Sequence, residues 1–117
     1  MFSQTHNLLI DSIFSLRGWC RENLPTENSL IAYDIVLILA IHNYSKSTIT
    51  VKQLFSSVPY SYTAIRKHYQ RLLADDWIEL YSDTVDKRIK FVRPTTKFLS
   101  TMNQYAETIN DLFNHQT

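Results

Sequence analysis

Several features that identify common protein classes are scarce in this 117-residue sequence. Its single glycine, Gly18, excludes glycine-rich phosphate-binding loops and dinucleotide-binding fingerprints. Its single cysteine, Cys20, cannot form an internal disulfide, which is typical of a protein kept in a reducing cytoplasm. The most apolar segment, residues 30–41, is too short to span a bilayer and predicts a buried central helix. The first residues lack the basic start of a signal peptide, so we expect a cytoplasmic protein without membrane association.

No arrangement of residues predicts catalysis or a bound metal. The four histidines, at positions 6, 42, 68 and 115, have no metal-ligand spacing with one another or with Cys20. Neither paired carboxylates nor a Ser/His/Asp arrangement is visible. We therefore expect no enzyme activity and no cofactor, and we expect His68 to lie on an exposed helix face.

The net charge of +1 hides an uneven distribution. Residues 46–97 contain ten Lys and Arg against five Asp and Glu, a balance of +5, whereas the remainder has two against six, a balance of −4. A basic centre between acidic ends indicates a nucleic-acid-binding core with separate segments for assembly.

The basic centre begins with a helix-turn-helix pattern. Thr50 and Gln53 have the spacing of a capping box and predict a short helix, which Pro59 ends. Ser61 is a candidate N-cap for a second helix. Apolar residues on one side of that helix recur at helical spacing: Ile65, Tyr69, Leu72 and Leu73. The other side of the second helix is polar and basic, so we expect it to be exposed.

A basic hairpin follows the second helix, because the periodicity changes from 3.6 to 2. Ile78 and Leu80 alternate with polar residues in a first strand, and Ile89 and Phe91 do so in a second. The polar segment 82–86 between them predicts the tip. A helix followed by a basic hairpin is the winged helix-turn-helix arrangement, in which the helix fits a major groove and the hairpin contacts the neighbouring backbone or minor groove.

The segment Asp86–Thr95 resembles the wing of MarR-type transcriptional regulators, in which Asp-x-Arg precedes a strand and Leu-Thr. Residues 61–65 and 72–79 are similar to the recognition helix of that family and its exit, and the resemblance covers most of the chain. Pro94 stands where the family has Leu, and Asp76 where it has Gly. Because Asp adopts a left-handed conformation more easily than most residues, we expect Asp76 to end the helix as the glycine would.

The exposed side of the second helix and the hairpin are the predicted DNA-binding surface. No acidic residue lies between Ser61 and Ala74, whereas ordinary solvated helices mix both signs of charge. We expect Arg66 to contact base edges. The resemblance implies that Arg88 enters the minor groove while Asp86 holds the shape of the wing. The predicted DNA-binding residues are Ser61, Tyr62, Thr63, Arg66, Lys67, Gln70, Arg71, Asp86, Lys87, Arg88 and Lys90.

The predicted helices at both ends of the chain carry more apolar surface than one small domain needs. The last helix also has apolar residues at heptad spacing. Residues 1–22 and 96–114 are therefore predicted to contribute to a homodimer. The predicted dimerisation residues are Leu9, Ile13, Leu16, Leu99, Met102, Ala106, Ile109 and Phe113.

Cys20 has two interpretations. Some MarR-type proteins sense organic hydroperoxides through a cysteine of the first helix that tyrosines activate, and Tyr33 is a candidate partner here. However, Cys20 lies near the end of its predicted helix, where the helix dipole disfavours a thiolate, although Arg21 opposes this effect. We interpret Cys20 as a small buried residue on the side of the helix that faces the partner.

The sequence thus predicts one α+β, mostly helical domain over residues 1–117, with a helix-turn-helix and two-stranded wing in residues 50–95. The predicted function is sequence-specific binding of double-stranded DNA as a dimeric transcriptional regulator, and the resemblance implies a repressor. Two alternatives stay open: a winged-helix module whose basic face binds an acidic protein, and a plasmid or phage replication or partition factor. The resemblance also implies that a cleft between the dimerisation and DNA-binding regions could hold a small aromatic ligand.

Overall fold

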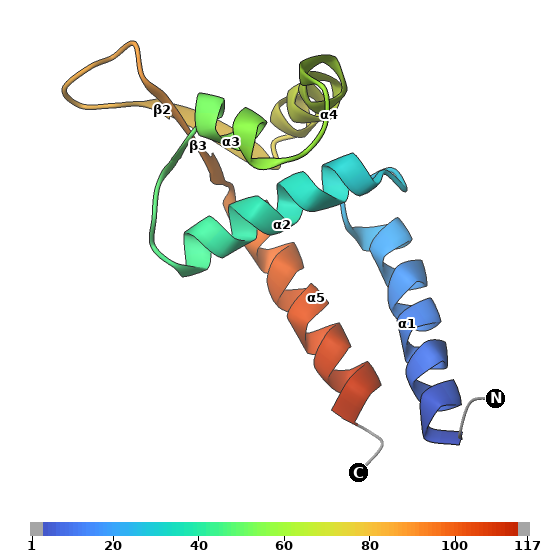
Figure 1. The fold of residues 1–117 in the computed structure, drawn as a ribbon. Helices are drawn as coiled ribbons and strands as arrows, with labels where there is room; N and C mark the ends of the chain where they lie inside the picture. Colours follow the sequence, from blue (N-terminus) through green and yellow to red (C-terminus); the bar gives the residue numbers. More distant parts are fainter. Residues whose placement is uncertain (1–3, 115–117) are drawn as a thin grey trace.

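The computed structural model describes residues 4–114, and His115 lies outside this range. The elements in chain order are α1 (Gln4–Asn23), α2 (Leu30–Tyr44), β1 (Ile49–Thr50), α3 (Val51–Ser57), α4 (Tyr62–Ala74), β2 (Ile78–Ser82), β3 (Lys90–Pro94) and α5 (Thr96–Asn114). Helix α2 crosses the middle of the molecule, with α3, α4 and the hairpin on one side and α1 and α5 projecting from the other (Figure 1). We call residues 30–94 the winged body and the pair α1 and α5 the stalk.

The hairpin β2–β3 forms the predicted wing, and a third strand joins it. All pairings are antiparallel and the strand order is β1-β3-β2, so the central strand is β3. Val92 of β3 lies opposite both Ile49 of β1 and Leu80 of β2. The predicted winged helix-turn-helix fold is therefore confirmed, with one more strand than expected.

The side of the second strand that faces the core differs from the expectation. Val92 is buried, whereas Ile89 lies outside β3 and is 40% exposed. Phe91 is half-buried and stacks on Tyr81 with 5.2 Å between ring centroids. The prediction that Ile89 and Phe91 form the apolar side is wrong, because Val92, between the other two strands, packs towards α2.

Three N-caps are present, the predicted ones at Thr50 and Ser61 and a further one at Ser29. Ser29 caps α2 by accepting from Ala32 N at 3.4 Å, and Ser61 caps α4 by accepting from Ala64 N at 3.2 Å. At α3 both halves of the capping box form: Gln53 N donates to Thr50 Oγ1 at 3.0 Å, and Thr50 N donates to the Gln53 side chain at 2.8 Å. Each cap satisfies backbone donors that the first turn of a helix leaves unpaired, and this fixes where α2, α3 and α4 begin.

Asp76 ends α4 as predicted. Its φ is 64°, in the left-handed region. Asp76 N donates to Leu73 O at 3.2 Å and Trp77 N donates to Leu72 O at 2.9 Å, which is the Schellman pattern. The chain turns sharply there and enters β2 at Ile78, so the wing stands directly beside α4.

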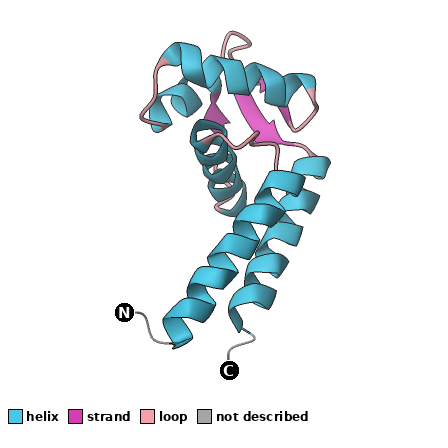
Figure 2. Ribbon diagram, turned by 90° about the vertical axis from the view of Figure 1, so that its right-hand side faces the viewer, coloured by secondary structure: helices cyan, strands magenta, loops and turns pink. Residues whose placement is uncertain are grey.

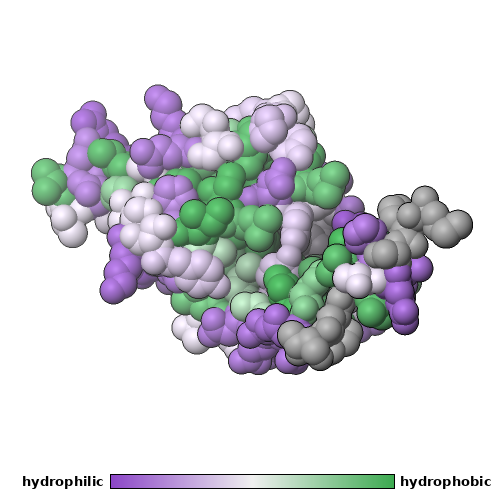
Figure 3. All heavy atoms as spheres, turned by 60° about the horizontal axis from the view of Figure 1, so that its bottom comes forward, coloured by the Kyte–Doolittle hydropathy of each residue, from purple (hydrophilic) through white to green (hydrophobic). Residues whose placement is uncertain are grey.

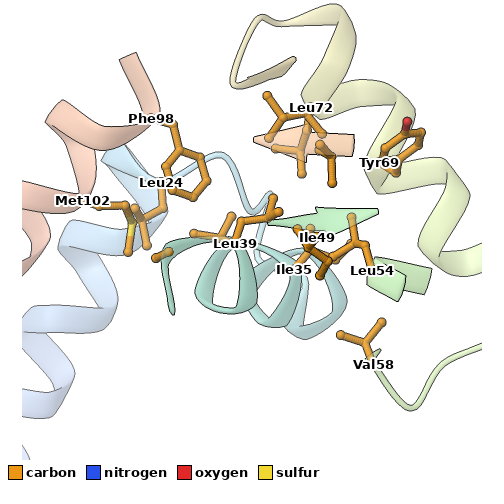
Figure 4. Close-up of a cluster of buried hydrophobic side chains, with 14 of the residues drawn as sticks. Leu24, Ile35, Leu39, Ile49, Leu54, Val58, Tyr69, Leu72, Phe98 and Met102 are labelled. Carbon is orange, nitrogen blue, oxygen red and sulfur yellow. The ribbon is translucent and has the colours of Figure 1, made fainter. Parts of the chain in front are cut away.

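The core gathers around α2 and joins the winged body to the stalk (Figure 4). Ile35 and Leu39 of α2 have no exposed surface. Leu24, Phe98 and Met102 lie together at the stalk end of the cluster. Truncation of a fully buried side chain such as Leu39 to alanine costs about 2–5 kcal/mol, so this cluster holds the two regions in one unit.

The two helices of the stalk lie side by side (Figures 1 and 2). Trp19 of α1 stacks on Tyr105 of α5 with 5.8 Å between ring centroids, and Tyr105 also makes a hydrogen bond with Tyr33 of α2. Near the free ends, Ser12 Oγ donates to Leu112 O at 3.0 Å. The stalk makes the molecule long, with extents of 56 × 27 × 22 Å. None of the helices described is long and apolar enough to cross a membrane.

Candidate nucleic-acid interface

An open groove lies between α3, α4 and the base of the wing. Its volume is about 840 Å³. Four cations line it: Lys52, Arg66, Arg88 and Lys90. None of the described residues that line it is acidic, and its remaining surface comes from aromatic, apolar and uncharged polar side chains. The charged side chains that line this groove are therefore all positive.

Helix α4 presents its polar side outward at this groove. Ser61, Thr63 and Lys67 are exposed, and Tyr62 is 63% exposed. The Gln70 amide lies against Arg66, and with its oxygen facing the guanidinium it accepts from Arg66 Nε at 3.0 Å and Nη2 at 3.1 Å. Gln70 and the exposed Arg66, one turn apart on α4, thus lie within hydrogen-bond reach of each other.

The tip of the wing is organised by two carboxylates. Asp83 Oδ2 accepts from Val85 N at 3.1 Å and from Asp86 N at 2.8 Å. The Asp86 carboxylate accepts from Arg88 Nε and Arg88 Nη2, both at 3.0 Å, and from Arg88 N at 3.0 Å. These bonds from Arg88 hold the pKa of Asp86 below its usual range. The Arg88 side chain is nonetheless 90% exposed, so the hydrogen-bonded tip of the wing presents a guanidinium to solvent.

The structure brings together five of the predicted DNA-binding residues in the groove: Tyr62, Arg66, Gln70, Arg88 and Lys90. Ser61, Thr63, Lys67 and Lys87 are exposed without lining it, and Asp86 is half-buried behind Arg88. Lys52 was missed by the sequence analysis. Its position in the first turn of the capped helix that precedes α4 was the available signal.

Arg71 does not share the exposed face of α4, so that expectation is wrong. Arg71 Nη2 donates to Pro25 O at 2.9 Å and Arg71 Nε lies 3.1 Å from Glu27 Oε1, and the side chain is only 20% exposed. At about 100° per residue, position 71 lies roughly 80° around the helix from Thr63 and faces the α1–α2 connection. The Arg71 guanidinium is therefore paired within the chain, with Glu27 and the Pro25 carbonyl.

His68 is also buried, at 8% exposure, instead of lying on an exposed helix face. Its Nε2 is 3.1 Å from Ser29 Oγ. Burial lowers the pKa of His68, and the neighbouring charges of Arg71 and Lys67 lower it further, against a smaller opposing effect of Glu27. Within residues 4–114 no group of three His, Cys, Asp or Glu side chains is arranged to hold a metal ion.

The stalk exposes apolar side chains, as the predicted dimerisation surface requires. Leu9 is 36% exposed, Ile13 49% and Phe14 73%. Of the other predicted dimerisation residues, Ala106 is exposed and Leu16, Leu99, Ile109 and Phe113 are half-buried. Figure 3 shows hydrophobic surface reaching the outside near the free ends of the stalk helices. Met102 differs from the expectation, because it is buried in the chain's own core beside Leu24 and Phe98 and offers nothing to a partner.

Comparison with known proteins identifies the fold. No protein-family model and no curated protein matches the sequence, but solved structures do. A MepR–DNA complex from S. aureus aligns with a TM-score of 0.73 at 13% identity, over 97% of this chain and 90% of that one. The transcriptional regulator Tm0710 from Thermotoga maritima aligns with a TM-score of 0.65 at 17% identity, over 93% and 75%. A mutant MarR from E. coli complexed with operator DNA gives 0.59 at 19% identity, over 93% and 76%.

These identities are low, so the similarity establishes the fold: the chain has the winged-helix fold of MarR-type transcriptional regulators, as the resemblance in sequence predicted.

Proposed function

From the fold shared with MarR-type regulators, we propose that this chain binds double-stranded DNA sequence-specifically and regulates transcription as a homodimer, acting as a repressor. The observation that carries the proposal is the groove beside α4, in which four cations face solvent and no described lining residue is acidic. Two of the similar structures are DNA complexes, and this supports the same ligand for the same fold.

Two parts of the interface would divide the contacts. An α-helix fits the major groove, and an Arg that reaches base edges there can bind guanine through two hydrogen bonds. Arg66 suits this role because it is exposed on α4 and lines the groove. Arg88 suits contact with the adjacent phosphates or minor groove, because it extends from the wing.

The start of α4 adds a site for phosphate contact. Ser61 and Tyr62 lie where unpaired backbone donors and the helix dipole favour an anion. Tyr62 packs on Phe55 of α3 with 5.1 Å between ring centroids, so the two helices present this end jointly.

Assembly would use the exposed apolar side of the stalk. Ile13 and Phe14 are exposed in the single chain. A second chain that covers such side chains would stabilise the dimer by about 25 cal/mol per Å² of apolar surface buried. A two-fold dimer would carry two copies of α4 and therefore favour a near-palindromic site.

A protein-binding role is the second candidate, and the groove itself supplies the reason. Phe55, Tyr62 and Tyr69 give it an aromatic lining beside the cations, which would also suit an acidic peptide with apolar residues. A small aromatic ligand in a cleft between the dimerisation and DNA-binding regions stays a prediction. The described cavity between α1 and α2, beside Cys20 and Tyr33, holds only about 70 Å³, less than half of the roughly 150 Å³ cavity that takes up benzene.

Selection from a library of duplexes with random sequence, followed by mobility shift of the enriched duplex, tests the function. We expect enrichment of a near-palindrome whose half-sites lie about 10 base pairs or a multiple apart. A chain that shifts no duplex at low salt would contradict DNA binding. A shift without enrichment would contradict sequence specificity.

A further inference from the structure

The connection between α1 and α2 has a fixed and unusual shape. Two successive residues have positive φ, Glu27 at 49° and Asn28 at 61°. This conformation is unfavourable for Glu, which lacks the short side chain that eases it for Asn. Ser29 N donates to Thr26 O at 2.8 Å and closes the turn, and Thr26 is buried. In this conformation of the loop, the Glu27 carboxylate lies beside Arg71 of α4.

Arg71 ties this loop to α4 at two points. Its guanidinium donates to the Pro25 carbonyl at 2.9 Å and pairs with the Glu27 carboxylate at 3.1 Å. Because the guanidinium is planar and its donors have fixed directions, two simultaneous contacts restrict its orientation far more than one contact would.

His68 makes a third connection, one turn earlier on α4. Its Nε2 is 3.1 Å from Ser29 Oγ, and the same oxygen accepts from Ala32 N and caps α2. The inner side of α4 is thus bonded both to the loop that follows the stalk helix α1 and to the first turn of α2. The outer side of the same helix carries Arg66 and Gln70.

We infer that the α1–α2 loop is a clamp that sets the orientation of α4, and that Arg71 and His68 are positioning residues for DNA binding. This inference rests on the proposed function and deepens it. A rotation of α4 by about 10° would move the end of a long side chain by roughly 1 Å, and a specific contact tolerates less than that. The clamp therefore controls specific contacts made by Arg66 but not general attraction to phosphates.

The salt dependence of binding separates a positioning residue from a contact. A side chain that neutralises a phosphate contributes about one unit to the slope of log K against log salt, and removing it weakens binding to every duplex. Loss of a positioning residue weakens binding only to the selected sequence and leaves this slope unchanged. Lys67 is the matched control, because it is an exposed cation on the same helix.

The experiment compares Arg71→Met with Lys67→Met in full-length protein by fluorescence anisotropy. The probes are the duplex that the wild-type chain enriches from a random library and a scrambled duplex of equal length. For Arg71→Met we expect about tenfold weaker binding to the enriched duplex, unchanged binding to the scrambled one and an unchanged salt slope. For Lys67→Met we expect similar losses on both and a slope smaller by about one. A slope smaller by about one in Arg71→Met would overturn the inference.

Glu27→Gln keeps the test decisive if Arg71→Met fails to fold, since Glu27 is 60% exposed. Removal of an acidic charge strengthens simple attraction to DNA, so electrostatics alone predicts equal or tighter binding to both duplexes. The clamp predicts weaker binding to the enriched duplex only, and equal or tighter binding to it would overturn the inference. If the wild-type chain binds no duplex, the proposed function fails. If the wild-type chain binds while Arg71→Met lowers the salt slope by about one and Glu27→Gln binds the enriched duplex equally or more tightly, only the clamp is contradicted.

Discussion

The winged body and the stalk expose opposite kinds of surface. The groove of the winged body holds four cations, one of which, Arg88, is hydrogen-bonded to Asp86. The stalk instead leaves Ile13 and Phe14 about half to three-quarters exposed, while Met102 and Phe98 tie it to the common core. Positive side chains cost little in water and gain from phosphates, whereas large apolar side chains gain only when another surface covers them. One chain thus carries its cationic groove and its exposed apolar side chains in separate regions.

The largest effect is expected from a charge placed on the stalk. Ile13 is 49% exposed, so Ile13→Glu does little harm within one chain, but a partner that covers this position would bury an unpaired carboxylate. We expect monomers in sedimentation at micromolar concentration, and binding to the enriched duplex weaker by about a hundredfold or more because two linked sites become one.

Ser15→Glu is the matched control for the stalk, because Ser15 is exposed on the same helix and lies about 200° from Ile13 around its axis. It should leave the mass unchanged. A wild-type chain that sediments as a monomer, or an Ile13→Glu variant that stays dimeric, would refute the assignment of the stalk to assembly.

The second largest effect is expected from a substitution in the groove of the winged body. Arg66→Ala should cost about 1–3 kcal/mol on the enriched duplex and much less on a scrambled one, because it removes a contact to base edges. Anisotropy titrations of both duplexes measure the difference. Arg17→Ala is the control: it removes an exposed cation from the stalk and should leave the affinity for both duplexes unchanged. Equal losses on the two duplexes would show that Arg66 contacts only phosphates.

Arg88→Ala should act differently from Arg66→Ala, although both residues line the groove. Because contacts to phosphates carry little sequence information, we expect both duplexes to bind more weakly by similar factors, with a salt slope smaller by about one. A loss confined to the enriched duplex would mean that the wing contributes specificity directly.

Acid should weaken the junction between the two regions through His68. Burial lowers the pKa of His68 from the ordinary value of 6.5, so the unfolded chain takes up this proton first as the pH falls. The contribution of neutral His68 to the free energy of unfolding is fully present above pH 6.5, the ordinary pKa. It is lost as the pH falls from there towards the lowered pKa of the folded chain. We expect the midpoint of denaturant unfolding to fall between about pH 7.5 and 5.5, and to fall less in His68→Asn. An equal fall in both proteins would contradict the burial of a neutral imidazole.

The smallest effect is expected at Cys20. Burial raises the pKa of its thiol, with an opposing effect of Arg17, so little reactive thiolate forms. Cys20→Ser should leave DNA affinity unchanged, and peroxide should have no effect on either protein in a mobility shift. Release of DNA by the wild-type chain on peroxide treatment, absent in the serine variant, would assign a sensor to the stalk.

Local signals in the sequence predicted the parts of the fold that depend on nearby residues. The capping box at Thr50, the cap at Ser61 and the left-handed end of α4 at Asp76 each depend on bonds within a few residues, and all three are present. The polar side of α4 was equally visible, because its spacing follows the helix period.

Contacts between distant segments could not be predicted in this way. Arg71 and His68 carry the residue types of an exposed basic face, and only the packing of residues 24–29 against α4 turns them inward. The two residues of β1 are too few to show a period, and without that strand the buried side of β3 at Val92 was ambiguous. Met102 fits a heptad seam, but the position of Leu24 decides that its own chain covers it.

The salt dependence of duplex binding by the wild-type chain tests the central claim most directly. If the groove beside α4 is a DNA-binding surface, three of its cations, Lys52, Arg88 and Lys90, and the exposed Lys67 of α4 should release counterions on binding. Log K should then fall linearly with log salt, with a slope of about −3.6 for each chain bound if each cation meets one phosphate. An anisotropy titration at several salt concentrations with the enriched duplex gives this slope. A slope near zero, or no binding to duplex at the lowest salt, would contradict the account.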